Sequence, residues 1–219
     1  MRKVAFYGGS FDPPHKGHLT IARKLIEIFE LDEFVFIPAF HAPHKKDKKP
    51  TSAFHRFAML CLATEGKDKI KVSKIELEAP EKPYTFETQT KLKGKLTDAE
   101  IFFVIGADSW QEIDTWREWE RVLTLTNIIV VTRPDYEISF THVTEKIKNR
   151  IVDIRENRKL ETKVQSLKTK DQKIYITDAI NLDISATEIR QKILARESDW
   201  RELVPSPVAK HIEKYELYI

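Results

Sequence analysis

The first 38 residues place two short apolar runs on either side of one amphipathic segment, and this order constrains the fold more than any other feature. The runs at 4–7 and 34–37 have the composition of strands buried on both faces. Between them, apolar residues over 18–29 recur at three- and four-residue intervals, which is the spacing of an amphipathic helix. A strand, a helix and a strand at these lengths form a βαβ unit, so the chain predicts a parallel sheet.

The rest of the chain continues this alternation. Further strands are expected at 71–77, 101–105, 127–132 and 174–176, and helices at 53–63, 85–93, 110–123 and 185–194. Pro207 follows Ser206, which predicts a serine cap at the start of a last helix. Residues 135–173 are polar and irregular, and their pattern leaves a helical excursion and a mobile insert both open. We therefore expect an α/β fold, a Rossmann-like doubly wound parallel sheet with C-terminal helices, in one domain over 1–219 with a polar insert at about 135–173.

The composition narrows the classes of ligand. Hydrophobic residues make up 41% and charged residues 32%, as in folded globular proteins. The 37 basic and 34 acidic residues leave a net charge of only +3, which favours a small anionic ligand over a nucleic acid.

One cysteine and the absence of long apolar stretches narrow the expected compartment. Cys61 is the only cysteine, so an intrachain disulfide and a cysteine zinc cluster are both excluded. Its apolar neighbours favour a small buried residue over a nucleophile. The apolar run near Met1 is too short for a signal peptide, and no stretch has the length of a membrane span. We therefore expect a cytoplasmic protein with no membrane partner.

The strongest chemical signal is the string GGSFDPPHKGH at residues 8–18, between the first expected strand and the first expected helix. Ligands of open parallel sheets bind beyond the carboxyl ends of strands. Gly8 and Gly9 lack a Cβ atom and would let a ligand approach the backbone, and the helix start offers N–H groups to phosphate. His15 and His18 lie three residues apart and would face the same way on a helical turn. A histidine pair alone is more often structural, and the string is neither G-x-G-x-x-G nor a Walker loop.

The complete string resembles the signature of the nucleotidyltransferase superfamily with the H-x-G-H motif. The second signature of that superfamily is a serine–threonine string that opens a late helix, and ISATEIR at residues 184–190 matches it. Ala186 stands where many relatives carry serine. The resemblance implies ATP binding by Gly8, Gly9, Ser10, Phe11, His15, His18, Ile184, Ser185, Thr187 and Arg190.

Four further segments resemble the nicotinate-nucleotide adenylyltransferase branch: PHK at 43–45, PYT at 83–85, GADS at 106–109, and Trp116. The resemblance implies that the nucleotide acceptor is bound by His44, Lys45, Tyr84, Thr85, Gly106, Asp108 and Trp116. A structural alternative stays open for two of these segments. The lysines that follow Lys45 are typical of a solvated basic loop, and Trp116 lies near Trp110 and Trp119 at the spacing of a packed helix face.

The resemblance also implies a mechanism, in which the 5′-phosphate of nicotinate mononucleotide attacks the α-phosphorus of ATP and pyrophosphate leaves. The implied catalytic residues are His18 at the α-phosphate and His15 and Arg190 at the triphosphate, with Lys45 at the rim. Mg²⁺ is expected to be held mainly by the ATP phosphates, with no metal site built from side chains.

Other activities remain open from the sequence. The acceptor could be nicotinamide mononucleotide or phosphopantetheine, although GADS at 106–109 and Trp116 disfavour the latter. A tRNA-synthetase-like module would use the basic residues of 146–173 to bind RNA, but the chain has no room for an anticodon-binding domain. The expected partners are therefore ATP and nicotinate mononucleotide and no nucleic acid. The sequence does not choose between a monomer and a homo-oligomer.

Overall fold

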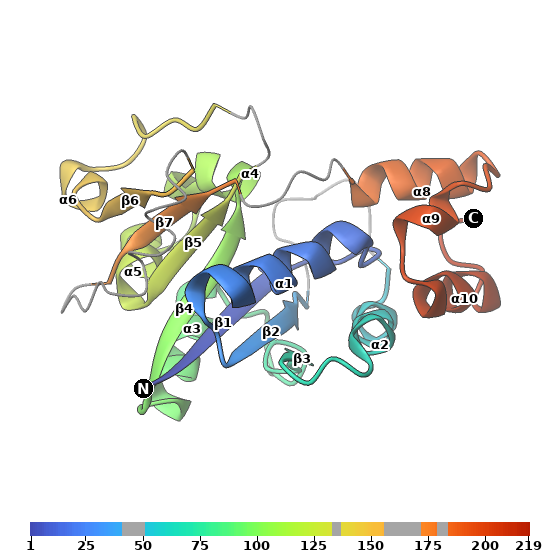
Figure 1. The fold of residues 1–219 in the computed structure, drawn as a ribbon, viewed down its shortest axis with the longest axis horizontal. Coiled ribbons are helices and arrows are strands. Elements are labelled where there is room, and N and C mark those ends of the chain that lie inside the picture. Colours follow the sequence, from blue (N-terminus) through green and yellow to red (C-terminus); the bar gives the residue numbers. More distant parts are fainter. Residues whose placement is uncertain (41–50, 133–136, 156–171, 179–183) are drawn as a thin grey trace.

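The chain folds into a parallel sheet covered by helices (Figure 1), as seen in a computed structural model that describes residues 1–40, 51–132, 137–155, 172–178 and 184–219. The strands are β1 (Arg2–Gly9), β2 (Glu33–Pro38), β3 (Ile70–Val72), β4 (Ala99–Gly106), β5 (Asn127–Val131), β6 (Ile151–Asp153) and β7 (Ile174–Thr177). The helices are α1 (Lys16–Phe29), α2 (Ala53–Thr64), α3 (Thr85–Lys95), α4 (Ala107–Gln111), the 3-10 helix η1 (Ile113–Thr115), α5 (Trp119–Leu125), α6 (Glu145–Lys148), α8 (Ala186–Leu194), α9 (Trp200–Leu203) and α10 (Ser206–Lys214).

The described strands form one seven-stranded sheet in the order β3-β2-β1-β4-β5-β7-β6, and every neighbouring pair is parallel. The chain moves outward from β1 through β2 to β3, and then returns to place β4 on the other side of β1. Ligands of doubly wound sheets bind where the strand order reverses in this way, beyond the carboxyl ends of the strands. The predicted Rossmann-like α/β fold is confirmed, and it directs attention to the ends of β1 and β4.

Each face of the sheet has its own hydrophobic core, because successive side chains of a strand point to opposite faces. Ala5 of β1 belongs to the α1-face core, which includes buried side chains of α1, α2, α8 and α10. Val4 and Phe6 belong to the α3-face core, which includes side chains of α3, α4 and α5. In Figure 1, α1 lies in front of the sheet and α8, α9 and α10 gather at one end of the molecule. Strands covered on both faces explain the continuous apolar runs.

The segment between β4 and β5 is not the single helix expected at 110–123. It is divided into α4, η1 and α5. Trp116 is extended, with φ −78° and ψ 142°, and Glu118 has a positive φ of 52°, so a helix cannot run through this point. The roughly helical spacing of Trp110, Trp116 and Trp119 is consistent with a continuous helix, but in the structure Trp110 is buried in the α3-face core and the other two only pack against it.

Three smaller expectations were also wrong. The strand expected at 71–77 is limited to β3, after which the chain turns with a hydrogen bond from the Glu78 N–H to the Lys74 carbonyl (2.9 Å). Helix α10 is preceded by Pro205 as its N-cap residue, and Ser206 lies inside the first turn without capping it. Cys61 is exposed on α2 instead of buried.

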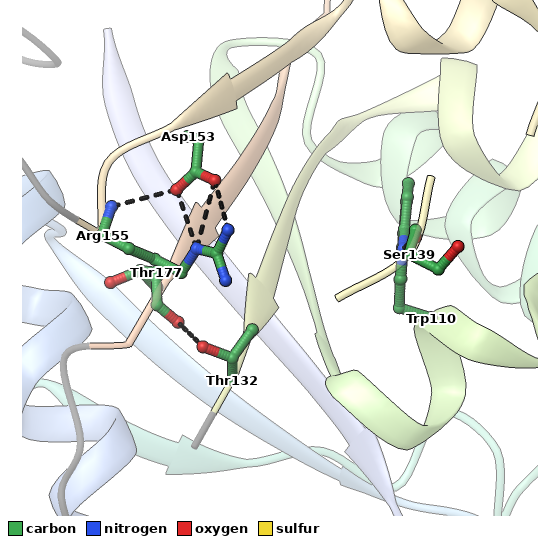
Figure 2. Close-up of polar contacts among 6 residues, drawn as sticks. All are labelled: Trp110, Thr132, Ser139, Asp153, Arg155 and Thr177. Carbon is green, nitrogen blue, oxygen red and sulfur yellow. Dashed lines mark hydrogen bonds and ion pairs between the residues drawn. The ribbon is translucent and has the colours of Figure 1, made fainter. Parts of the chain in front are cut away.

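The polar stretch at 135–173 contributes α6 and an edge strand to the fold. Strand β6 pairs with β7 from Ile151 to Asp153. Beyond β6, the Arg155 guanidinium pairs with the Asp153 carboxylate at 2.6 Å, and the Thr132 hydroxyl donates to the Thr177 carbonyl at 3.3 Å (Figure 2). The first contact is local to the end of β6, and the second ties the carboxyl end of β5 to that of β7.

Candidate active site

The loop after β1 folds back on itself through two glycines. A Cβ atom on Gly9 would lie 2.9 Å from Cζ of Phe11, and one on Gly8 would lie 3.3 Å from Cζ of Phe103. Phe11 is buried, at 3% exposure. Its backbone has a positive φ of 49°, a conformation that residues other than glycine rarely adopt. In the direction in which a side chain would point from each glycine, the space is therefore filled by a phenylalanine ring of the protein.

His15 and His18 lie together as the three-residue spacing predicts. His15 is the N-cap residue of α1, and its ring stacks on that of His18 with centroids 3.6 Å apart and an interplanar angle of 29°. The His15 backbone N–H donates to Nδ1 of His18 at 3.1 Å. The ring of Phe11 meets His18 edge-on at 4.9 Å. Both imidazoles are thus oriented by the first turn of α1 and by the loop before it.

The environment of His18 determines its protonation state. Burial, and secondarily the neighbouring His15, hold the pKa of His18 well below its ordinary value, although its ring keeps some exposed surface. The side chain is therefore neutral at neutral pH. Because Nδ1 accepts a hydrogen bond, the single ring proton of the neutral imidazole is on Nε2. His18 thus presents an N–H donor without a fixed charge.

Gly17 is the point at which the two sequence motifs meet. A Cβ atom there would lie 2.9 Å from Nδ1 of His15 and 3.7 Å from Cβ of Ile184. The glycine of H-x-G-H therefore leaves room for the His15 ring, and the start of the serine–threonine string lies at van der Waals distance from the same position. Residues 184–190, which lie far along the sequence, are brought against the first turn of α1.

The second motif begins α8 with a side-chain cap. Ser185 Oγ accepts hydrogen bonds from the N–H groups of Thr187 (3.2 Å) and Glu188 (3.3 Å). The Arg190 guanidinium donates to Thr187 Oγ1 (3.2 Å) and to the Asp12 carbonyl oxygen (2.6 Å). Arg190 therefore bridges the serine–threonine helix and the loop after β1.

Asp12 lies in this loop, and the sequence analysis gave it no role. It is 7% exposed, and its Oδ1 accepts from the Tyr218 hydroxyl at 2.7 Å while its Oδ2 accepts from the Thr51 N–H at 3.2 Å. The presence of Asp12 inside the string at 8–18 was a signal that could have been used. No local pattern in the sequence pointed to Tyr218 as its partner.

Arg56 is a second functional candidate that the sequence analysis missed. It is 1% exposed and donates to the carbonyl oxygens of Ser10 (2.6 Å), Ala39 (2.6 Å) and Thr51 (2.9 Å). Burial lowers its pKa, and the charge of Asp12 opposes this shift. Arg56 thereby joins the motif loop to both sides of residues 41–50. His44 and Lys45, which were expected to bind the acceptor, lie outside the described residues.

The carboxyl end of β4 presents Gly106 and Asp108. Gly106 is the N-cap residue of α4, and Asp108 is exposed in its first turn. A Cβ atom on Gly106 would meet no atom within 4 Å, so the space beside it is open. Burial and the charge of Asp108 raise the pKa of Tyr7, on the neighbouring β1, to about 12. Asp108 therefore acts electrostatically on the end of β1 where the histidines lie.

Tyr84, Thr85 and Trp116 lie on the α3 face. Tyr84 is the exposed N-cap residue of α3, and Thr85 is its first helical residue. The Arg117 guanidinium lies 4.7 Å above the Tyr84 ring, which places the segment after η1 against the start of α3. Trp116 is half-buried and packs against the α3-face core, whereas Trp110 is fully buried there. Tyr84, Thr85 and Trp116 thus lie on the α3 face of the sheet, whereas Phe11 and Ile189 of the ATP motifs belong to the α1-face core.

The described residues contain neither a cluster of metal ligands nor a membrane-spanning helix. No group of three His, Cys, Asp or Glu side chains in this part of the chain is placed to hold a metal ion. No helix among the same residues is long and apolar enough to span a membrane.

Comparisons with known proteins agree with this geometry. A family model described as cytidylyltransferase-like matches residues 6–192. A probable nicotinate-nucleotide adenylyltransferase of Desulfatibacillum aliphaticivorans is 34% identical, over 99% of this chain and 100% of the relative. The nicotinate-nucleotide adenylyltransferase of Bacillus subtilis (strain 168) is 29% identical, over 100% of this chain and 99% of the relative.

Solved structures share the fold. Nicotinic acid mononucleotide adenylyltransferase from Plasmodium falciparum, complexed with NaAD, superimposes with a TM-score of 0.71 at 21% identity. The match covers 100% of this chain and 98% of that chain. At this identity the likeness establishes the architecture.

Proposed function

Because the chain belongs to the cytidylyltransferase-like family and its full-length relatives are nicotinate-nucleotide adenylyltransferases, we propose that it transfers the adenylyl group of ATP to nicotinate mononucleotide. The products are nicotinate adenine dinucleotide and pyrophosphate, in the biosynthesis of NAD. An oxygen of the acceptor 5′-phosphate forms a bond to the α-phosphorus of ATP. The bond from the α-phosphorus to the oxygen that bridges it to the β-phosphate breaks.

The observation that carries this proposal is the contact between the two motifs at Gly17 and Asp12, beside the neutral imidazole of His18 with its Nε2–H donor. The acceptor phosphate is ionised near neutral pH, with a second pKa of about 6, so the reaction needs no strong base. It needs alignment of two anions and stabilisation of charge at the α-phosphate. In the proposed mechanism, the Nε2–H of His18 donates to an α-phosphate oxygen, and His15 and Arg190 hold the triphosphate. The N–H group of Ser185 and the hydroxyls of Ser185 and Thr187, at the start of α8, complete the phosphate site.

Mg²⁺ fits this site as an ion that arrives with the nucleotide. The described residues offer no cluster of three ligating side chains, and Mg²⁺ commonly binds through substrate phosphates and water. When bound, it neutralises part of the triphosphate charge and assists the departure of pyrophosphate. The reaction consumes ATP, and we therefore place the enzyme in the cytoplasm, where ATP is available.

The acceptor side of the proposal rests on Trp116, Tyr84, Thr85, Gly106 and Asp108. The flat, electron-poor pyridine ring suits the indole face of Trp116, and N–H and hydroxyl donors near Tyr84 and Thr85 suit the nicotinate carboxylate. A carboxylate only accepts hydrogen bonds, whereas the amide of nicotinamide also donates. A pocket lined with donors therefore selects nicotinate. His44 and Lys45 are proposed to add a cationic rim.

The decisive experiment incubates the purified protein with ATP and Mg²⁺ and, separately, nicotinate mononucleotide, nicotinamide mononucleotide or phosphopantetheine. We expect nicotinate adenine dinucleotide by mass spectrometry, and the highest kcat/KM for the nicotinate acceptor. An equal or reversed preference would reject the nicotinate assignment. If no acceptor gave a dinucleotide and the protein bound tRNA tightly at physiological salt, the RNA-binding alternative would replace adenylyl transfer.

The role of Trp116 has its own test within this assay. An aromatic contact contributes about 0.5–1.5 kcal/mol beyond area burial, so Trp116→Ala should raise the KM for nicotinate mononucleotide roughly two- to twelvefold. Trp119→Ala, which alters another half-buried tryptophan of the α3-face core, is the matched control. An unchanged KM in Trp116→Ala would assign this tryptophan to core packing alone.

A further inference from the structure

Asp12 connects its own loop, after β1, to three other segments of the chain that are far apart in sequence. Its main-chain oxygen accepts from Arg190 of α8 at 2.6 Å. Its carboxylate accepts from the backbone of Thr51, just before α2, at 3.2 Å. The same carboxylate accepts from the hydroxyl of Tyr218, four residues beyond α10, at 2.7 Å. The loop after β1 is therefore held in place from three directions.

The contact with Tyr218 supplies this carboxylate with a strong side-chain donor. A buried carboxylate that loses a donor is left with an unsatisfied charge, which the surrounding loop must relax to relieve. O–H donors to a carboxylate form short, strong hydrogen bonds, and the 2.7 Å separation is of this kind. Burial and the charge of Asp12 raise the pKa of Tyr218, so its hydroxyl stays protonated at any working pH.

Movement of Asp12 would reach the phosphate-binding groups directly. His15 follows Asp12 by three residues, and the Arg190 guanidinium is bonded to the Asp12 carbonyl oxygen itself. Reacting groups displaced by about 1 Å can lose about a hundredfold in rate. The position of the Asp12 loop thus controls the geometry of the triphosphate site.

From these contacts we propose that Tyr218 is a positioning residue for adenylyl transfer, which holds Asp12 so that His15 and Arg190 face the triphosphate. The inference rests on the proposed function, because it assigns Tyr218 a part in the use of ATP. Tyr218 does not touch the reacting atoms. Its effect passes through Asp12.

The test compares Tyr218→Phe, which removes one oxygen atom, with Tyr215→Phe. Tyr215 belongs to the same segment and is 47% exposed, and its ring packs on His211 at 4.6 Å, a contact that phenylalanine preserves. We expect Tyr218→Phe to lower kcat/KM for ATP about tenfold, with the KM for the acceptor within twofold of wild type. Tyr215→Phe should stay within twofold of wild type in every constant. The Tm of both variants should be measured as well. A loss of kcat/KM in a variant that is still fully folded at the assay temperature cannot be due to unfolding.

A double-mutant cycle with Asp12→Asn tests the route of the effect. If Tyr218 acts through the Asp12 carboxylate, adding Tyr218→Phe to the Asp12→Asn variant should lower kcat/KM for ATP by less than a further twofold. The inference would be overturned if the losses in kcat/KM of the two single variants multiplied in the double variant. It would also be overturned by a Tyr218→Phe enzyme with a lower Tm and unchanged kcat/KM for ATP. Tyr218→Phe alone decides the question if Asp12→Asn does not fold. A wild-type protein without activity on any acceptor would instead reject the proposed function.

Discussion

The His18 ring is set by close contacts with Phe11 and His15, and its Nδ1 is engaged by the His15 backbone. The proposed donor to the α-phosphate is therefore held rigidly before ATP binds. Preorganised donors of this kind lower the barrier because little reorganisation is needed during the reaction.

For His18→Ala we predict a fall in kcat of about 10²–10³, the usual effect of removing one such donor. A contact made in the transition state affects kcat more than KM, and far-UV circular dichroism should show an unchanged fold. Lys16→Ala, which alters an exposed residue of the same helical turn, should stay within threefold of wild type. A near-normal kcat in His18→Ala would remove this residue from the chemistry.

Gly17 gives a second prediction, because only its missing side chain allows the His15 ring to approach so closely. Gly17→Ala would place a methyl group 2.9 Å from Nδ1 of His15, so that ring must move. We expect kcat/KM for ATP to fall about tenfold or more, by steady-state kinetics. Gly94→Ala is the control, since a Cβ there meets no atom within 4 Å in α3. Full activity in Gly17→Ala would show that the ring position is not needed.

Among the elements, Arg56 of α2 holds the residue after β2, the loop after β1 and the segment that leads into α2. Arg56→Met removes the donor of three partly buried hydrogen bonds to carbonyl oxygens, and a polar group left unsatisfied in the interior costs about 1–3 kcal/mol. We predict that the free energy of unfolding in urea falls by about 3 kcal/mol or more. Arg23→Met, at an exposed position of α1, should change it by less than about 0.5 kcal/mol. A similar small change for Arg56→Met would show that other groups hold these segments.

Helices α2 and α10 meet through a histidine pair. Nδ1 of His55 lies 3.1 Å from Nε2 of His211, and the ring of Tyr215 lies 5.0 Å and 4.6 Å from the two imidazoles. One ring nitrogen must donate and the other accept, so the bond requires at least one neutral imidazole. Burial, then the charges of His55 and Lys214, lower the pKa of His211.

This lowered pKa predicts a pH dependence of stability with a definite sign. The unfolded imidazole titrates near a pKa of about 6.5, so in acid the unfolded chain binds protons before the folded one does. The stability from this contact is present above about pH 6.5 and is lost as the pH falls through the folded pKa. The Tm should therefore fall less between pH 7.5 and pH 5.5 in His211→Gln than in wild type. An equal fall of Tm in the variant and the wild type would show that the histidine pair does not titrate between pH 7.5 and pH 5.5.

For the whole molecule, the two cores share one sheet, and β1 contributes to both. Helices α8 and α10 also belong to the α1-face core, although they follow the last strand. We predict that the chain unfolds as one cooperative unit. Hydrogen-exchange mass spectrometry in increasing urea should show peptides from β1, β7 and α10 losing protection at the same midpoint. Separate midpoints would divide the chain into independent units.

The sequence by itself determined the features that depend on local periodicity and spacing. The parallel βαβ order follows from apolar runs and helical intervals, and the contact of His15 with His18 follows from their separation by one helical turn. Periodicity was less informative for a helix with apolar residues on most of its sides. The segment around Cys61 in α2 is apolar on most sides, so its pattern did not mark the exposed face. The break at Trp116 was missed because Trp110, Trp116 and Trp119 recur at a roughly helical spacing, and the sequence between them contains neither glycine nor proline.

Only the tertiary structure decided which distant segments meet at the site. The bond from Tyr218 to Asp12 joins residues 206 positions apart, and the bond from Arg190 to the Asp12 carbonyl joins residues 178 positions apart. The buried hydrogen bonds of Arg56 likewise connect three loops that no short pattern relates. Such contacts arise from the packing of α2, α8 and α10 on the sheet, and local propensity does not encode that packing. The resemblance of two motifs predicted that they act together, and the structure brings them into contact where Arg190 of α8 bonds to the Asp12 carbonyl oxygen of the loop after β1.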